Sequence, residues 1–172
     1  MAKLYMRVCV LLALVAALSA CGFHLRSALP WPAEWKTAYI SQDHARELAP
    51  VLHRVLVEKG VTLVEESQAD VVIELKNEKT TRTSLAIDAV GKISEYALAY
   101  EVKCQARDRT GNIVLPLQRF SASRSYAFAP ADALGHELQE EQMYQAMRRQ
   151  VVGEMLEQLT ALAIARQGEA AK

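Results

Sequence analysis

Residues 95–107 read EYALAYEVKCQAR, and apolar and polar side chains alternate along this stretch. Because successive side chains of a strand point to opposite faces of a sheet, the pattern predicts a long strand with one buried face. Cys104 belongs to the apolar set, so we interpret it as a small core residue and not as a reactive thiol. The apolar set is Tyr96, Leu98, Tyr100, Val102, Cys104 and Ala106, and the polar set is Glu101, Lys103, Gln105 and Arg107.

Two further strands are expected on either side of this one in the chain. Residues 70–81 alternate in the same way, and residues 113–126 follow a hairpin signal, RTGN. Pro116 in the last strand predicts an edge position or a bulge, because proline cannot donate a ladder hydrogen bond. The connection 82–93 contains Gly91 and is expected to form a hairpin tip. In the strand at 70–81 we expect Val71, Ile73 and Leu75 on one face and Glu74, Lys76 and Glu78 on the other.

A first helix is indicated by Leu48, Leu52, Val55 and Leu56, which share one face at helical spacing. It is expected to begin near residue 46 or 47, because Pro50 is tolerated only in a first turn, where its missing N–H has no intrahelical partner. Gly60 follows as a glycine that ends a helix would.

A second, longer helix is expected from a cap at Asp132 to about Ala165. Its apolar residues step by three or four positions, so one stripe faces the core. This stripe comprises Tyr144, Met147, Val151, Met155, Leu159 and Leu162, flanked by Val152 and Leu156.

The order of these elements predicts the architecture. With a short first strand at 37–41, the chain runs strand, helix, antiparallel strands, helix, which favours an α+β fold. We predict a two-layer sandwich, with two helices packed on one face of a mostly antiparallel four-stranded sheet. The single domain spans 37–165, and a polar tail follows at 166–172. The other face of the sheet stays free for solvent or a partner.

The chain begins with a segment typical of a signal peptide, expected over 1–20. Two basic residues precede an apolar run at 8–18, which is too short to span a hydrocarbon core of about 30 Å. The residues LSAC at 18–21 resemble the bacterial lipoprotein signal. This resemblance implies cleavage before Cys21, with diacylglycerol on its thiol and an N-acyl chain on its amine. No other cofactor is expected.

Residues 21–36 are then a lipidated N-terminus and tether. Gly22 after the cysteine is similar to the residue found in lipoproteins exported to the outer membrane, so we expect a lipid-anchored outer-membrane location. Anchoring through several acyl chains is stable, whereas a single chain binds only marginally. An ordinary signal peptide that happens to precede a cysteine is the alternative interpretation.

Composition and motifs favour a binding or structural protein. Without the signal segment the chain has 18 basic and 20 acidic residues, which argues against a nucleic-acid binder. Cys104 is then the only unmodified cysteine, so no internal disulfide is expected. The sequence contains no hydrolase, zinc or phosphate-loop motif, and its four histidines are scattered, so we expect neither an enzyme nor a metal site. A triad assembled by the fold is the alternative, because triads are recognised by geometry.

Charge is unevenly distributed along the chain. Residues 76–124 contain nine basic and five acidic side chains, whereas the segments on either side are acidic. A cluster of one sign focuses the local potential, so this region is interpreted either as a patch for an anionic partner or as a solvated sheet face.

Three stretches together resemble the LPS-assembly lipoprotein family, also called rare lipoprotein B, the small subunit of the outer-membrane lipopolysaccharide translocon. The likeness spans most of the mature chain. It lies in CGFHLR at 21–26, in Gly91 through Glu95 and Tyr96, and in Arg124–Tyr126, Pro130, Ala133, Leu134 and the segment 137–144.

The resemblance implies a plug inside a large outer-membrane β-barrel subunit, which helps that barrel assemble and contacts lipopolysaccharide. Family proteins place basic residues at the hairpin tip and at the turn into the last helix. Here the tip offers only Lys92, and the turn offers His136 in place of a lysine. The candidate lipopolysaccharide contacts are therefore Lys92, Arg124 and His136. A stand-alone envelope lipoprotein that binds a soluble ligand or the cell wall is the alternative function.

Overall fold

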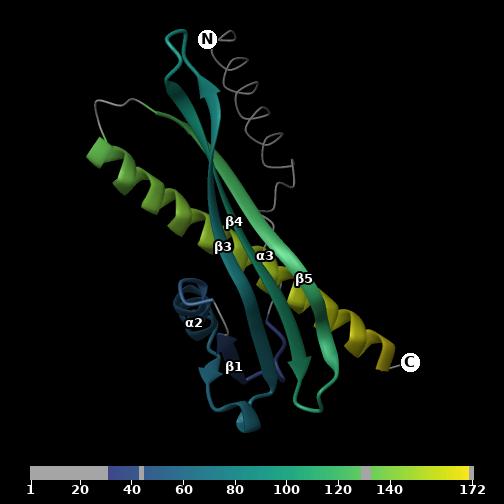
Figure 1. Ribbon diagram of the computed structural model, residues 1–172. Coiled ribbons are helices and arrows are strands. Elements are labelled where there is room, and N and C mark those ends of the chain that lie inside the picture. Colours follow the sequence, from purple (N-terminus) through teal and green to yellow (C-terminus); the bar gives the residue numbers. More distant parts are fainter. Residues whose placement is uncertain (1–30, 43–44, 129–132, 171–172) are drawn as a thin grey trace, which may run out of the picture.

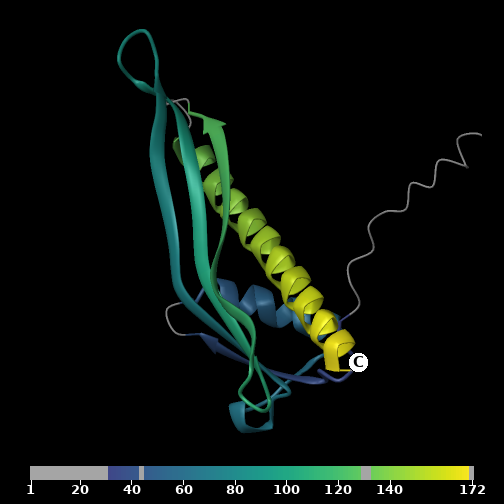
Figure 2. The ribbon, with the colours of Figure 1, turned by 90° about the vertical axis from the view of Figure 1, so that its right-hand side faces the viewer.

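The computed structural model describes residues 31–42, 45–128 and 133–170, which form an α+β sandwich of two layers. Both helices lie on one face of a twisted sheet, as expected (Figure 2). The elements are β1 (Thr37–Gln42), α2 (Leu48–Glu58), β2 (Thr62–Leu63), the short 3₁₀ turn η1 (Glu66–Gln68), β3 (Val71–Ile87), β4 (Ile93–Asp108), β5 (Ile113–Ala127) and α3 (Ala133–Ala170).

The sheet has five strands in the order β2-β1-β3-β4-β5, so the prediction of four strands was wrong (Figure 1). The sheet is also mixed, because β1 runs parallel to both β2 and β3, while the pairs β3–β4 and β4–β5 are antiparallel. The cause is the helix between β1 and β2. A helical crossover returns the chain to the end from which it started, and the next strand then runs parallel.

The starts of the parallel strands β1 and β3 are joined by one carboxylate. Asp70 Oδ2 accepts hydrogen bonds from the backbone N–H of Lys36 (3.0 Å) and Thr37 (2.9 Å) and from the Thr37 hydroxyl (2.8 Å). These bonds outweigh the effect of burial and lower the pKa of Asp70. A side chain thus fixes the register at the end of the ladder.

The end of α2 explains how the chain turns into β2. Gly60 has a φ of 82°, and its N–H donates to the Val57 carbonyl at 2.9 Å. The Val61 N–H donates to the Leu56 carbonyl at 3.0 Å. These two bonds and the left-handed glycine form a Schellman motif, which confirms Gly60 as the residue that ends this helix.

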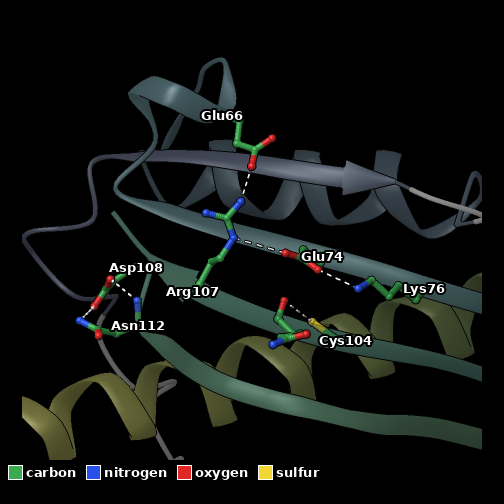
Figure 3. Close-up of polar contacts among 8 residues, drawn as sticks. Glu66, Glu74, Lys76, Cys104, Arg107, Asp108 and Asn112 are labelled. Atoms are coloured by element: carbon green, nitrogen blue, oxygen red, sulfur yellow. Dashed lines mark hydrogen bonds and ion pairs between the residues drawn. The ribbon is translucent and has the colours of Figure 1, made fainter. Parts of the chain in front are cut away.

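The two hairpins of the sheet use the same turn. In the sequences DAVGK (88–92) and DRTGN (108–112), the third-position and fifth-position amides donate to the aspartate carboxylate. Gly91 (φ 80°) and Gly111 (φ 87°) supply the left-handed residue that closes a three-residue loop. Figure 3 shows the second turn, where Asp108 accepts from Asn112.

The apolar patterns of the sequence correspond to the core. The predicted inner sets of β3 and β4 are buried, except that Tyr96 is half-buried. Cys104 is fully buried, which confirms it as a core residue, and this burial raises the pKa of its thiol to about 12. The predicted stripe of α3 packs on β4 and β5. Met147, Val151, Val152, Met155, Leu156 and Leu159 are buried, and Tyr144 and Leu162 are partly buried.

Pro116 occupies an edge strand and also a bulge. β5 is the last strand of the sheet, and its partners change from Gln118 opposite Cys104 to Leu115 opposite Ala106. Three steps on β5 therefore match two steps on β4. Both alternatives predicted for this proline are confirmed, since a bulge at an edge leaves no ladder bond for it to donate.

A second irregularity, in β3, overturns one prediction. The pairing shifts between Lys76 and Lys79, and Asn77 adopts a left-handed φ of 56°. Asparagine tolerates this conformation better than most residues. The extra residue reverses the alternation, so Glu78 points toward the helices and its side chain is only 9% exposed. The expectation that Glu78 faces outward with Glu74 and Lys76 was therefore wrong.

Glu78 joins four elements of the fold. Its Oε1 accepts from the Tyr100 hydroxyl at 2.7 Å, and its Oε2 accepts from the Glu47 N–H at 3.0 Å, where α2 begins. The guanidinium of Arg148, a buried residue of α3, lies 3.9 Å away. Burial and the bond to Glu78 raise the pKa of Tyr100, so its hydroxyl stays protonated and donates. An enclosed carboxylate is tolerated here because it is hydrogen-bonded and paired.

Some element ends differ from expectation. β3 continues to Ile87 through half of the segment expected as a connection, and α3 continues to Ala170 beyond the expected end at Ala165. The cap expected at Asp132 lies outside the described residues. Trp35 is buried, and the Trp31 ring packs against it at 5.5 Å, so the end of the tether segment is docked on the domain.

The hydrogen bonds around Glu78 predict that removal of the Tyr100 hydroxyl destabilises the folded protein. Tyr100→Phe should lower the free energy of unfolding by about 1.5–3 kcal/mol, because a hydrogen bond to a charged acceptor is lost in an enclosed site. Urea denaturation followed by circular dichroism measures the change. Tyr39→Phe is the matched control, and an equal effect of the two substitutions would contradict the role given to Glu78.

The Asp108 turn predicts a pH-dependent contribution. Burial raises the pKa of Asp108, but the bonds from Thr110 and Asn112 outweigh it and lower the pKa below its usual value of 3.8. The ionised carboxylate therefore stabilises the folded state above about pH 4, and this stabilisation is lost as the pH falls through the lowered pKa. Asp108→Asn should be destabilising at pH 7, and its difference from the wild type should shrink below pH 3. A difference that stays constant across this range would refute the assignment.

Candidate functional site

The three predicted contact residues lie in separate places. Lys92 is exposed in the β3–β4 turn. Arg124 is exposed on β5, with its Nη2 3.5 Å from the Gln150 Oε1 on α3. His136 is buried near the start of α3. The structure thus does not gather them into one pocket, and Cys21 lies outside the described residues.

The tip of the β3–β4 hairpin is the most distinctive surface near Lys92. It extends past the start of α3, and neither α2 nor α3 covers it (Figure 2). Three large apolar side chains on or next to the tip are solvent-exposed: Leu85 (56%), Ile87 (69%) and Val90 (76%). A cation beside exposed apolar side chains suits an amphiphilic ligand that carries negative charge, because both parts of such a ligand find a matching group.

An aromatic cluster fixes α3 to the base of this hairpin. The Arg82 guanidinium stacks on the Tyr96 ring at 3.7 Å and lies 3.1 Å from Glu140 of α3. The Tyr126 hydroxyl donates to Glu140 and accepts from Arg82 at 3.2 Å. Burial, followed by the contact with Glu140, raises the pKa of Tyr126 to about 12, so the hydroxyl remains a donor.

His136 belongs to the same aromatic cluster. Its ring lies 4.7 Å from that of Phe128 and 5.7 Å from that of Tyr126. The Phe128 ring in turn makes an edge contact with Tyr96 at 5.1 Å. His136 therefore connects the first turns of α3 to the strands that carry the tip.

The open face of the sheet carries most of the charge noted in the sequence, and much of it is paired. Arg107 bonds to Glu66 of η1 and lies 3.3 Å from Glu74 of β3, and Glu74 in turn lies 2.9 Å from Lys76 (Figure 3). Such a chain of ion pairs ties η1 across the lower part of the sheet. These cations are thus partly neutralised by neighbouring acids.

Other site types find little support in the described part of the chain. No group of three or more metal-ligating side chains occurs among residues 31–42, 45–128 and 133–170. Within the same ranges, no helix has the length and apolarity to cross a membrane. A groove of about 640 Å³ lies between α2 and the β1–β2 edge, and it contains none of the predicted site residues.

Comparison with known proteins identifies the family. A model of the LptE family, described as lipopolysaccharide-assembly, matches residues 35–159. The chain is 33% identical over 147 residues to the LPS-assembly lipoprotein LptE of Photorhabdus laumondii. These residues cover 84% of this chain and 80% of that protein. The chain belongs to the LptE family.

Solved structures show the same fold as this LptE-family chain. The solution structure of lipoprotein B from Nitrosomonas europaea matches with a TM-score of 0.68 and 24% identity, over 84% of this chain and 94% of that one. The crystal structure of rare lipoprotein B from Shewanella oneidensis matches with a TM-score of 0.67 and 19% identity, over 76% and 98%. The resemblance stated from the sequence is thereby confirmed at the level of family and fold.

Sequence reasoning missed the residues that hold the tip in place. Arg82 was counted only as one basic residue among nine, and Glu140 only as part of the segment 137–144 that carries the family resemblance. No sequence signal linked them, because the β3 bulge decides that Arg82 points toward the helices. The structure shows this orientation, because Arg82 pairs with Leu98, whose side chain points into the core.

The aromatic cluster predicts that Arg82 couples α3 to the hairpin. Arg82→Met should lower the free energy of unfolding by about 1–2 kcal/mol, because a cation–π stack, a hydrogen bond to Tyr126 and an ion pair with Glu140 are lost. It should also speed amide hydrogen exchange over residues 136–144. Arg119→Met is the control, since its pair with Glu101 is solvent-exposed and worth little. Unchanged exchange in the Arg82 variant would show that the cluster does not hold the helix.

Proposed function

We propose that this chain is a lipid-anchored outer-membrane lipoprotein that plugs and helps assemble a β-barrel lipopolysaccharide translocon, and that contacts lipopolysaccharide during its insertion into the outer leaflet. The observation that carries the proposal is membership of the lipopolysaccharide-assembly family, with the match over residues 35–159. The lipoprotein-like LSAC at 18–21 supports the anchor. The role is structural, with no catalytic step assigned to any residue.

The dimensions of the molecule support a plug. β3 has 17 residues and α3 has 38, so each is about 56 Å long. The apolar band of an outer-membrane barrel is about 25 Å tall. A rod of strands and helix longer than that band can reach through a barrel with its tip at one end. The lipid anchor keeps the chain at the membrane and raises its effective concentration near the barrel.

The hairpin tip supports the lipopolysaccharide contact. Lys92 offers a charge-assisted hydrogen bond to a phosphate, and the apolar Leu85, Ile87 and Val90 offer a surface for acyl chains. In this proposal Arg124 and His136 contribute nearer the base of the hairpin. His136 acts there through its packing in the aromatic cluster, which orients the strands leading to the tip.

Co-purification tests the plug directly. The intact lipoprotein should retain a large outer-membrane barrel protein in a stoichiometric complex after mild detergent extraction, and its depletion should reduce surface lipopolysaccharide and raise outer-membrane permeability. Recovery as a free lipoprotein, with normal permeability after depletion, would instead support the stand-alone envelope lipoprotein.

The duplicated turn provides a matched test of the tip. Lys92→Glu should weaken lipopolysaccharide binding several-fold, because a cation next to the ligand phosphates becomes an acid. Arg109→Glu also reverses a positive charge, in the same type of turn at the opposite end of the sheet, and should leave binding unchanged. Binding of purified lipopolysaccharide to the two variants is compared by equilibrium titration. Equal losses, or no loss in either variant, would exclude the tip as the contact.

A further inference from the structure

A row of three cations crosses the open face of the sheet. Lys76 of β3 lies directly opposite Lys103 of β4, and Lys103 lies directly opposite Arg119 of β5. The three positions share one level of the sheet and one face, because Lys103 alternates with the buried Val102 and Cys104. Like charges at directly opposed positions destabilise a sheet, so this row opposes folding.

The positive charges of the two outer residues of the row are partly neutralised by neighbouring carboxylates, but the charge of the central residue is not. Lys76 lies 2.9 Å from Glu74, and Arg119 lies 3.2 Å from Glu101. Lys103 stands between them with no acidic partner among the residues that the structure describes. The Asn77 bulge adds Lys79 to the same face, opposite Glu101. The row therefore keeps an unbalanced positive charge at its centre.

The surface between this row and the hairpin tip is smooth. On β4 it carries Ala97 and Ala99, and on β5 it carries serines at the paired positions. Both helices lie on the opposite face, and within the described ranges no element covers this part of the sheet (Figure 2). Side chains this small let another flat surface approach closely. The residues of this surface are Thr81, Thr83, Ala97, Ala99, Ser121, Ser123 and Ser125.

We propose that the cation row seats the open face against an acidic patch on the wall of the β-barrel subunit. This inference rests on the proposed plug function. It adds that the open face of the sheet contacts the barrel and that the positive charges on this face hold the plug in place. A like-charge row that weakens the isolated domain becomes favourable once acidic groups of the partner oppose it. Complementary potentials of this kind fix the register of an interface and suppress wrong partners.

The arrangement fits a protein wall better than a lipid headgroup. The cations are spread across three strands, interleaved with Glu74 and Glu101, and do not converge on one pocket. Glu74 and Glu101 would repel the several charges of a phosphate, whereas a protein wall can place its acidic groups opposite the cations and neutral or basic groups opposite these two carboxylates. The adjoining flat patch also suits a β-sheet wall, because sheets pack face to face at about 10 Å.

Charge reversal at the centre of the row separates docking from folding. Lys103→Glu should cut recovery of the barrel with the intact lipoprotein at least tenfold in mild detergent. The same substitution should raise the Tm of the domain by a few degrees, since like-charge pairs with Lys76 and Arg119 become opposite-charge pairs. Lys103→Gln should give a smaller loss of the complex. Arg149→Glu, an exposed reversal on α3, is the matched control and should leave recovery unchanged.

Each result decides one point. A more stable Lys103→Glu domain that no longer holds the barrel supports the proposal. Full recovery of the barrel with both Lys103 variants overturns it, and so does a retained complex with weakened lipopolysaccharide binding, which would assign the row to the lipid. Failure of the wild-type lipoprotein to hold any barrel would reject the plug function itself, and this is seen before any variant is made.

Discussion

Both faces of this protein depend on one extra residue in β3. The left-handed backbone at Asn77 reverses the alternation of the strand, which turns Glu78 toward the helices and Lys79 toward the open face. On the inner side, Glu78 then joins β3, β4, α3 and the start of α2 through Tyr100, Arg148 and a backbone amide. On the outer side, Lys79 joins the face that carries the cation row of Lys76, Lys103 and Arg119. Without the bulge, the carboxylate would be solvated and the helices would lose their shared partner.

Regular patterns in the sequence predicted the regular parts of the fold. Each of these parts follows from a rule that acts over a few residues, and each was found where it was expected. They are the alternation in β4, the apolar stripe of α3 and the glycine after α2. The orientation of Glu78 was not predictable in this way, because a single inserted residue changes no composition or spacing that would mark it. Parallel pairing of β1 was missed for a different reason. A two-residue strand such as β2 carries too little pattern to be recognised, although the helix before it implies a parallel return.

The candidate site was predicted only in part. Lys92 was placed at the hairpin tip by Gly91 and its neighbours, and the structure shows this tip exposed beside apolar side chains. The base of the hairpin was beyond sequence reasoning, since Arg82, Tyr126, His136 and Glu140 come from three elements far apart in the chain. Their contact depends on how α3 crosses the sheet. The result is a long hairpin with a helix fixed at its base, an amphiphilic tip and a cationic face on the side away from α2 and α3.

Site-specific photo-crosslinking in intact cells tests most directly whether the open face is the one that meets the barrel. A photoreactive amino acid in place of Ser123 lies in the middle of the smooth part of this face, next to β4 and away from α3. We expect an ultraviolet-dependent adduct between this chain and a large outer-membrane β-barrel subunit. Adducts with lipopolysaccharide alone, or a barrel adduct formed from the exposed face of α3 at Arg149 but not from Ser123, would contradict it.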